Sequence, residues 1–139
     1  MKVILNGCII QPTQMIEDKV ILFDDKIEAI IPRAELKNYQ DLEVLDVDGQ
    51  YVAPGFIDLH IHGAGGKDTM DATPDALHKI SQVVAESGVT SFLPTTMTMN
   101  KKNIHNAFQN IKNTLGNNSL GAEILGVHME GPFINEEYK

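Results

Sequence analysis

The sequence lacks a second cysteine, since Cys8 is the only one among 139 residues. A lone cysteine excludes an internal disulfide and is typical of a reducing compartment, so we expect a cytoplasmic protein. Cys8 lies in the apolar run 3–10, which favours a small buried side chain over a reactive thiol.

The chain also lacks an excess of positive charge, because its formal net charge is −8. Nucleic acids and anionic membrane surfaces both reward clustered lysine and arginine, so we expect neither as a partner. There is no uninterrupted apolar run long enough for a membrane span or a signal peptide. An anionic small substrate is still compatible with the sequence, because local groups and metal ions can outweigh the net charge.

Two common catalytic motifs are missing. The sequence contains no G-x-S-x-G string, which argues against nucleophilic serine chemistry. It contains no Walker-type phosphate loop either, because residues 63–66 (Gly-Ala-Gly-Gly) lack the lysine and hydroxyl at the required spacing.

The sequence pattern changes character near residue 53. Before this point, short β-rich runs alternate with turn residues, and Asp24-Asp25 and Asp48-Gly49 each predict a tight hairpin. We therefore expect residues 1–52 to form a small β-sheet, or half of a β-sandwich, whose role is packing. The predicted strands are 2–10, 19–23, 27–31 and 43–47.

After residue 53 the pattern predicts an α/β fold. A helix should begin at Thr73-Pro74-Asp75 and end at Gly88, and a second helix should run from the cap Asn100 to Gly116. Strands separated by single helices imply parallel pairing through right-handed crossovers. The predicted strands are 56–62, 89–93 and 123–127.

His60 and His62 are the first candidate functional residues. Side chains alternate across a strand, so both imidazoles leave the same face, about 6.5 Å apart along the backbone. That spacing lets two rings bind one cation, although two histidines could instead bond to backbone or water. Asp58 shares this face. Its carboxylate could orient a ligating imidazole without itself binding the metal, or it could cap a turn or form a salt bridge.

Glu130 is the second candidate, at the end of another apolar run. The dipeptide Gly131-Pro132 forces a bend directly after it, which argues against a freely exposed acid. His128 shares the face of Glu130, and it is either a buried, hydrogen-bonded histidine or a further site residue. We favour the buried histidine.

Both motifs follow the carboxyl ends of predicted strands, which is the edge where ligands bind in α/β sheets. Thr95, Thr96 and Thr98 share this location, and we interpret them as turn and cap residues. Two neutral histidines and a carboxylate leave positive charge on a divalent ion, which can lower the pKa of bound water and polarise a carbonyl. The pattern therefore predicts hydrolysis of an amide or an ester.

Two segments of the sequence resemble a known family. Residues 54–63 (Pro-Gly-Phe-Ile-Asp-Leu-His-Ile-His-Gly) resemble the first barrel strand of the amidohydrolase superfamily. Residues 128–134 (His-Met-Glu-Gly-Pro-Phe-Ile) are more specific, and they resemble the N-acetylglucosamine-6-phosphate deacetylase family. The Gly-Ala-Gly-Gly loop and residues 88–95 strengthen this resemblance, which extends from Lys2 to Phe133.

The resemblance implies a partial (β/α)8 TIM-type barrel over residues 53–139, comprising its first three strands and two helices, preceded by part of a β-sandwich. It implies a divalent zinc or iron ion bound by His60, His62 and Glu130, with room for a second ion in the complete enzyme. Asp58 and His128 would lie behind these ligands. The implied activity is removal of acetate from N-acetylglucosamine 6-phosphate in amino-sugar catabolism.

The resemblance further implies that the chain corresponds to about the first third of such an enzyme. Two more histidine ligands, the phosphate-binding groups and the aspartate that acts as general acid and base would lie beyond residue 139. We therefore expect no catalytic acid or base in this chain and negligible activity from it alone. The alternatives are a cyclic-amide hydrolase of the same superfamily, or a non-catalytic unit that forms homo-oligomers through an exposed barrel edge.

Overall fold

The computed structural model describes residues 1–116, 121–135 and 137. The chain divides into two compact units, Met1–Pro54 and Gly55–Lys139, and each has a hydrophobic core of its own. The boundary falls close to the change in sequence pattern at residue 53. The packing role predicted for residues 1–52 and the hydrolase-barrel role predicted for residues 53–139 stay predictions.

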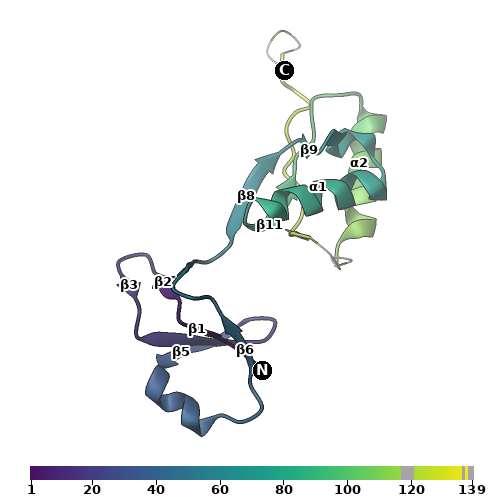
Figure 1. The fold of residues 1–139 in the computed structure, drawn as a ribbon. Coiled ribbons are helices and arrows are strands. Elements are labelled where there is room, and N and C mark those ends of the chain that lie inside the picture. Colours follow the sequence, from purple (N-terminus) through teal and green to yellow (C-terminus); the bar gives the residue numbers. More distant parts are fainter. Residues whose placement is uncertain (117–120, 136, 138–139) are drawn as a thin grey trace. The chain divides into compact units, whose positions relative to one another are not determined.

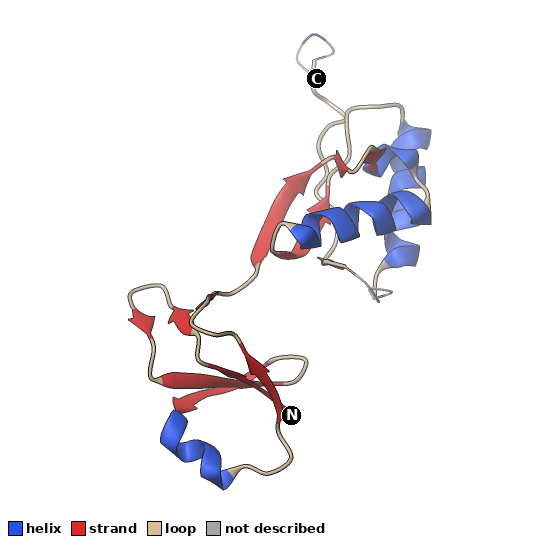
Figure 2. Ribbon diagram, viewed as in Figure 1, coloured by secondary structure: helices blue, strands red, loops and turns tan. Residues whose placement is uncertain are grey.

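The first unit consists of short strands and one 3-10 helix, η1 (Arg33–Asn38) (Figure 2). One sheet has four strands in the order β5-β4-β1-β6, and a second has three in the order β3-β2-β7. The core of the larger sheet is built on three buried side chains, Val3, Val20 and Leu22. The strands are β1 (Lys2–Leu5), β2 (Cys8–Ile10), β3 (Met15–Ile16), β4 (Lys19–Phe23), β5 (Ile27–Pro32), β6 (Glu43–Asp46) and β7 (Tyr51–Val52).

The turns of this unit confirm one predicted hairpin and correct two other predictions. β4 and β5 pair antiparallel around Asp24-Asp25, as predicted. The run predicted as one strand over 2–10 is divided, because Asn6 has a φ of 56° and β1 and β2 then enter different sheets. Asp48-Gly49 forms a turn, but the hairpin prediction is wrong because β6 pairs with β1 and β7 pairs with β2.

The second unit confirms the predicted alternation of strands and helices. β8 (Phe56–Ile61), β11 (Val89–Pro94) and β12 (Glu123–Ile124) form a parallel sheet in the order β12-β11-β8. α1 (Pro74–Glu86) packs against β11, and α2 (Lys101–Thr114) packs against α1 (Figure 1). The smaller elements are β9 (Gly63–Ala64), β10 (Lys67–Asp68) and the 3-10 helix η2 (Thr69–Asp71).

Both helices begin at the predicted caps. The Thr73 hydroxyl accepts the Ala76 N–H at 3.3 Å, and the Asn100 side chain accepts the Asn103 N–H at 2.9 Å. The second helix is shorter than its predicted range, because α2 ends at Thr114 and the next residue, Leu115, is exposed. The buried faces meet around Phe92 of β11. This core contains Leu77, Ile80, Val84, Phe92, Ile111, Ala122 and Ile124.

The third strand is shorter than its predicted range of 123–127. β12 ends at Ile124, and pairing with the β11 chain resumes only at an isolated bridge between Thr95 and His128. Pro94 lies between these two points and has no N–H to donate, so the ladder cannot continue there. The chain before His128 is therefore irregular. In the described residues, no helix is long and apolar enough to cross a membrane.

Candidate metal centre

The two histidines of the predicted pair lie together, as the strand geometry requires. His60 lies in β8 and His62 directly after it, and their Nε2 atoms are 3.3 Å apart. The chain then turns back at once through the β9–β10 hairpin, in which Gly65 and Gly66 both have positive φ. Gly63 is required there because a Cβ at this position would lie 2.1 Å from the Lys67 carbonyl oxygen.

Glu130 meets both histidines from the segment that follows β12. Its Oε2 lies 3.1 Å from His60 Nε2 and 3.5 Å from His62 Nε2. The bend predicted after it begins at Gly131, whose φ is 82°. A Cβ at Gly131 would lie 2.3 Å from the Thr98 hydroxyl, so only glycine fits this close approach. The structure therefore brings all three sequence-predicted ligands together.

The donor atoms of these three residues fit a small divalent cation. His62 Nδ1 lies 3.2 Å from the Thr95 carbonyl oxygen, which can only accept, so neutral His62 carries its lone pair on Nε2. This lone pair faces the Glu130 carboxylate and the Nε2 of His60. Two donors bound to zinc at tetrahedral angles lie about 3.3 Å apart. The three separations, from 3.1 to 3.5 Å, match that spacing.

Thr95 contributes more to this site than the sequence predicted. Its side chain is fully buried, and its hydroxyl accepts the Ile61 N–H at 3.0 Å and donates to the Leu93 carbonyl at 3.1 Å. Its backbone N–H donates to the Ile61 carbonyl at 2.8 Å, and its own carbonyl bonds the His62 ring. Thr95 therefore holds the chain between the two histidines. Its position directly after Pro94, at a strand end, is the one sequence signal that could have found it.

The two residues predicted behind the ligands occupy different places. Asp58 accepts the backbone N–H of His60 at 3.0 Å, so in this structure it fixes the main chain, and its predicted contact with an imidazole ring stays a prediction. His128 is half-buried, and its Nδ1 lies 2.8 Å from the Leu59 carbonyl oxygen. His128 is thus hydrogen-bonded, as predicted, but it lies beside the site rather than deep in the core.

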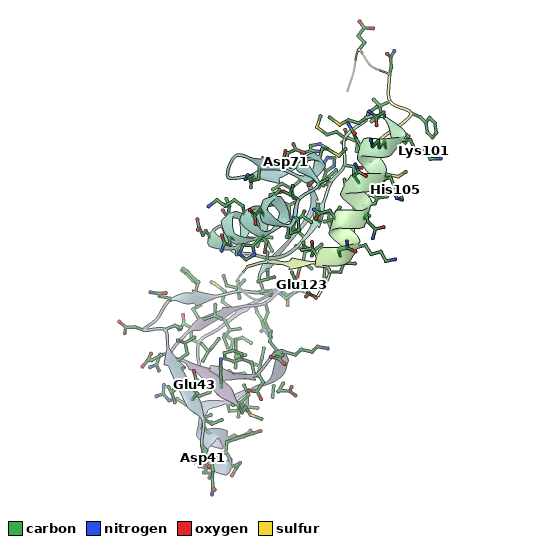
Figure 3. The ribbon with its side chains drawn as sticks, turned by 90° about the vertical axis from the view of Figure 1, so that its right-hand side faces the viewer. Asp41, Glu43, Asp71, Lys101, His105 and Glu123 are labelled. Atoms are coloured by element: carbon green, nitrogen blue, oxygen red, sulfur yellow. The ribbon has the colours of Figure 1, made fainter. Side chains whose placement is uncertain are left out.

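A groove of about 450 Å³ lies between α2 and the segment that follows Glu130. Lys101 and His105, which Figure 3 labels on α2, are the polar residues of its lining, whereas Ile104 and Phe108 are apolar. The described residues that line this groove include no carboxylate. Across the part of the chain that the structure describes, the groups that could hold a metal are therefore confined to the centre at His60, His62 and Glu130.

Known proteins with similar sequences are sugar-phosphate deacetylases. The chain is 40% identical to an N-acetylglucosamine-6-phosphate deacetylase of Lysinibacillus sphaericus, over 82% of this chain and 29% of the relative. It is 38% identical to an N-acetylgalactosamine-6-phosphate deacetylase of Escherichia coli O157:H7, over 70% of this chain and 26% of the relative. No family model matches the sequence.

A solved structure agrees with these sequences. The N-acetylglucosamine-6-phosphate deacetylase of Pasteurella multocida superposes with a TM-score of 0.84 at 29% identity, over 99% of this chain and 36% of that one. The chain is homologous to the N-terminal part of N-acetylglucosamine-6-phosphate deacetylases. It spans about a third of the length of these deacetylase relatives. The three relatives named here carry deacetylase names, and none of the three is named as a cyclic-amide hydrolase.

Proposed function

We propose that this chain supplies the N-terminal part of the active site of a metal-dependent deacetylase that acts on an N-acetylhexosamine 6-phosphate. The observation that carries the proposal is the convergence of the Nε2 atoms of His60 and His62 with a carboxylate oxygen of Glu130, in a chain homologous to deacetylases. Two histidines and one glutamate form a ligand set found in catalytic zinc sites.

His60 and His62 bind a divalent zinc or iron ion through Nε2, and Glu130 binds it through a carboxylate oxygen. Thr95 fixes the tautomer of His62 that leaves Nε2 free for the metal. When bound, such an ion supplies the Lewis acidity that activates water and polarises an amide carbonyl. A second ion and the aspartate that moves protons belong to the complete enzyme, so we expect negligible turnover by residues 1–139 alone.

The substrate is an N-acetylated amino sugar that carries a 6-phosphate. Hydrolysis adds water across the acetamide C–N bond and yields acetate and the free amine. The relatives are named for N-acetylglucosamine 6-phosphate and N-acetylgalactosamine 6-phosphate, and both the Lysinibacillus and the Pasteurella proteins carry the glucosamine name. We therefore propose N-acetylglucosamine 6-phosphate, a role in amino-sugar catabolism and a cytoplasmic location.

In the complete enzyme, β8, β11 and β12 are the first three strands of a (β/α)8 barrel, and α1 and α2 are its first two outer helices. The parallel order of these strands and the positions of the ligands at their carboxyl ends support this arrangement. Residues 1–52 form part of a β-sandwich and contribute no ligand to the metal.

Direct metal titration tests this proposal. We expect the unmodified chain to bind one Zn²⁺, measured by calorimetry and by elemental analysis after dialysis. His60→Ala removes one of three ligands and should weaken binding by at least about tenfold. His78→Ala is the matched control, because His78 is an exposed histidine of α1 whose side chain bonds Gln82, away from the centre. A metal content unaffected by His60→Ala would refute the assignment of His60.

The non-catalytic alternative is favoured by one specific observation. In the described residues, β8 has a strand partner on one side only, and it exposes Phe56, Ile57 and Leu59. An unpaired edge with apolar side chains invites self-association. Whether the chain forms homo-oligomers is thus a separate question from metal binding, and measurement of its mass in solution answers it.

A further inference from the structure

The side chain of His128 contacts the metal centre without belonging to its ligand set. Its ring lies 4.6 Å from the ring of His60, centroid to centroid, with an angle of 48° between the planes. Its Nδ1 lies 2.8 Å from the carbonyl oxygen of Leu59, the residue directly before His60. This carbonyl can only accept, so Nδ1 of His128 is the donor. His128 therefore connects the chain after β12 to the strand that carries His60.

The two ligand histidines are anchored unequally. His62 donates from Nδ1 to the Thr95 carbonyl, which fixes both its tautomer and its ring orientation. Within the described residues, the His60 ring has polar contacts only through Nε2, to His62 and Glu130. The His60 side chain is also the more exposed of the two, at 48% against 34% for His62.

Because Nδ1 of His60 has no partner among the described residues, ring contacts add to the Nε2 contacts in limiting the orientation of His60. The edge of His62 lies on one side, with ring centroids 5.1 Å apart and planes at 84°, and the tilted ring of His128 lies on another. Rotation of His60 toward either ring would have to displace that ring. Of these two rings, His128 is the one that does not belong to the ligand set, so holding His60 is the role its contact leaves for it.

We propose that His128 is a positioning residue that holds the His60 ring in its ligating orientation through the contact between the two rings. The hydrogen bond to Leu59 keeps the His128 ring at its place on β8. This inference rests on the metal site proposed above and goes beyond it, because it assigns a function to a side chain that does not touch the ion.

The proposal predicts that His128 acts on metal affinity only through His60. In the unmodified background, His128→Ala should raise the Zn²⁺ dissociation constant of the 139-residue chain about tenfold, the usual effect of removing a group that orients a ligand. In the His60→Ala background the same change should alter the constant by less than about twofold. His78→Ala should have no effect in either background, and circular dichroism verifies that each variant is folded.

Two further variants separate the ring from the hydrogen bond. His128→Phe keeps an aromatic ring against His60 and should retain most of the affinity. His128→Asn keeps a donor near the position of Nδ1 but has no ring, and it should lose as much affinity as His128→Ala. Retained affinity in His128→Asn together with a loss in His128→Phe would overturn the assignment to the ring.

The outcomes distinguish this proposal from the metal site itself. Absence of Zn²⁺ binding by the unmodified chain would overturn the metal site and His128 with it. Normal binding by the unmodified chain and by His128→Ala would overturn only the positioning role. An equal loss from His128→Ala in both backgrounds would also overturn it, because His128 would then act independently of His60.

Discussion

At the scale of single residues, Thr95 shows how the site is assembled from contacts between distant parts of the chain. The sequence identified His60, His62 and Glu130 because histidine and glutamate indicate ligand chemistry by their type. Thr95 has no such type signal, since threonine at a strand end usually makes a turn or a cap. Its role arises from bonds to Ile61 and His62, which are more than thirty positions away, and only the folded chain brings these groups together.

Thr95→Val should destabilise the protein, because it keeps the shape of the side chain but leaves the Ile61 N–H without its acceptor. An unsatisfied buried donor costs about 1–3 kcal/mol. Urea unfolding followed by circular dichroism measures the change in the free energy of unfolding. Thr95→Ser, which keeps the hydroxyl, is the matched control and should lose less stability. Equal losses in the two variants would contradict the role of the hydroxyl.

Asp46 makes the stability of the first unit depend on pH in the acid range. Its carboxylate accepts the Asp48 N–H at 3.0 Å and the Asn6 amide at 2.8 Å, and these bonds hold the pKa of Asp46 below its ordinary value of 3.8. Because the pKa is lower in the folded chain than in the unfolded chain, ionised Asp46 stabilises the fold at any pH above its unfolded pKa. This contribution is lost as the pH falls through the folded pKa.

Asp46→Asn should therefore lower the free energy of unfolding at pH 7, and the difference from the unmodified chain should shrink as the pH falls below 3.8 and through the lowered pKa. Urea unfolding at several pH values measures both effects. Asp25→Asn, at the exposed turn between β4 and β5, is the control and should change little. A difference that stays constant over the whole acid range would contradict the assignment to ionised Asp46.

At the scale of elements, the features that could be predicted best from the sequence are those set by residues close together in the chain. The caps Thr73 and Asn100 bond to groups three residues away, so the helix starts could be predicted directly. The turn at Asp48-Gly49 was predicted as a hairpin because its residues favour one, but the partner of β6 is β1, about forty residues earlier. The short β12 depends on Pro94 of the neighbouring strand. Local propensity specifies neither feature.

The start of α1 offers a test at this scale. Thr73→Ala removes the hydroxyl that accepts the Ala76 N–H, and an N-cap of this kind contributes about 1 kcal/mol. We expect a loss of that size in urea unfolding, with Thr73→Ser close to the unmodified chain. Because α1 is part of the core but carries no ligand, Zn²⁺ affinity of the folded protein should be unchanged. A weakened affinity would contradict the separation of packing from metal binding.

At the scale of the whole molecule, each of the two units exposes apolar surface among its described residues. The exposed side chains of β8 form one such surface, and a groove of about 380 Å³ in the first unit, lined by Ile4, Ile21 and Ile30 among others, forms another. Exposed apolar surface of this kind is typical of sites that contact another polypeptide. The alternation of strands and helices in the second unit could be predicted from periodicity, whereas the molecules that cover these surfaces could not.

We therefore expect the 139-residue chain to self-associate. Light scattering over a hundredfold range of protein concentration should show a mass that rises with concentration. Ile57→Lys together with Leu59→Lys places two charges on exposed positions of the β8 edge and should shift the equilibrium toward monomer. A clean monomer over the whole range would contradict this prediction and leave the metal site unaffected.

The two-histidine, one-carboxylate metal centre is the feature on which the proposed chemistry depends. X-ray absorption spectroscopy of the Zn²⁺-loaded protein detects it without an activity assay, because scattering from imidazole rings reports which ligands are bound. We expect nitrogen and oxygen ligands at about 2.0–2.1 Å, with two imidazoles in the unmodified chain and one in His60→Ala. A shell without imidazole, or one that His60→Ala leaves unchanged, would refute the centre.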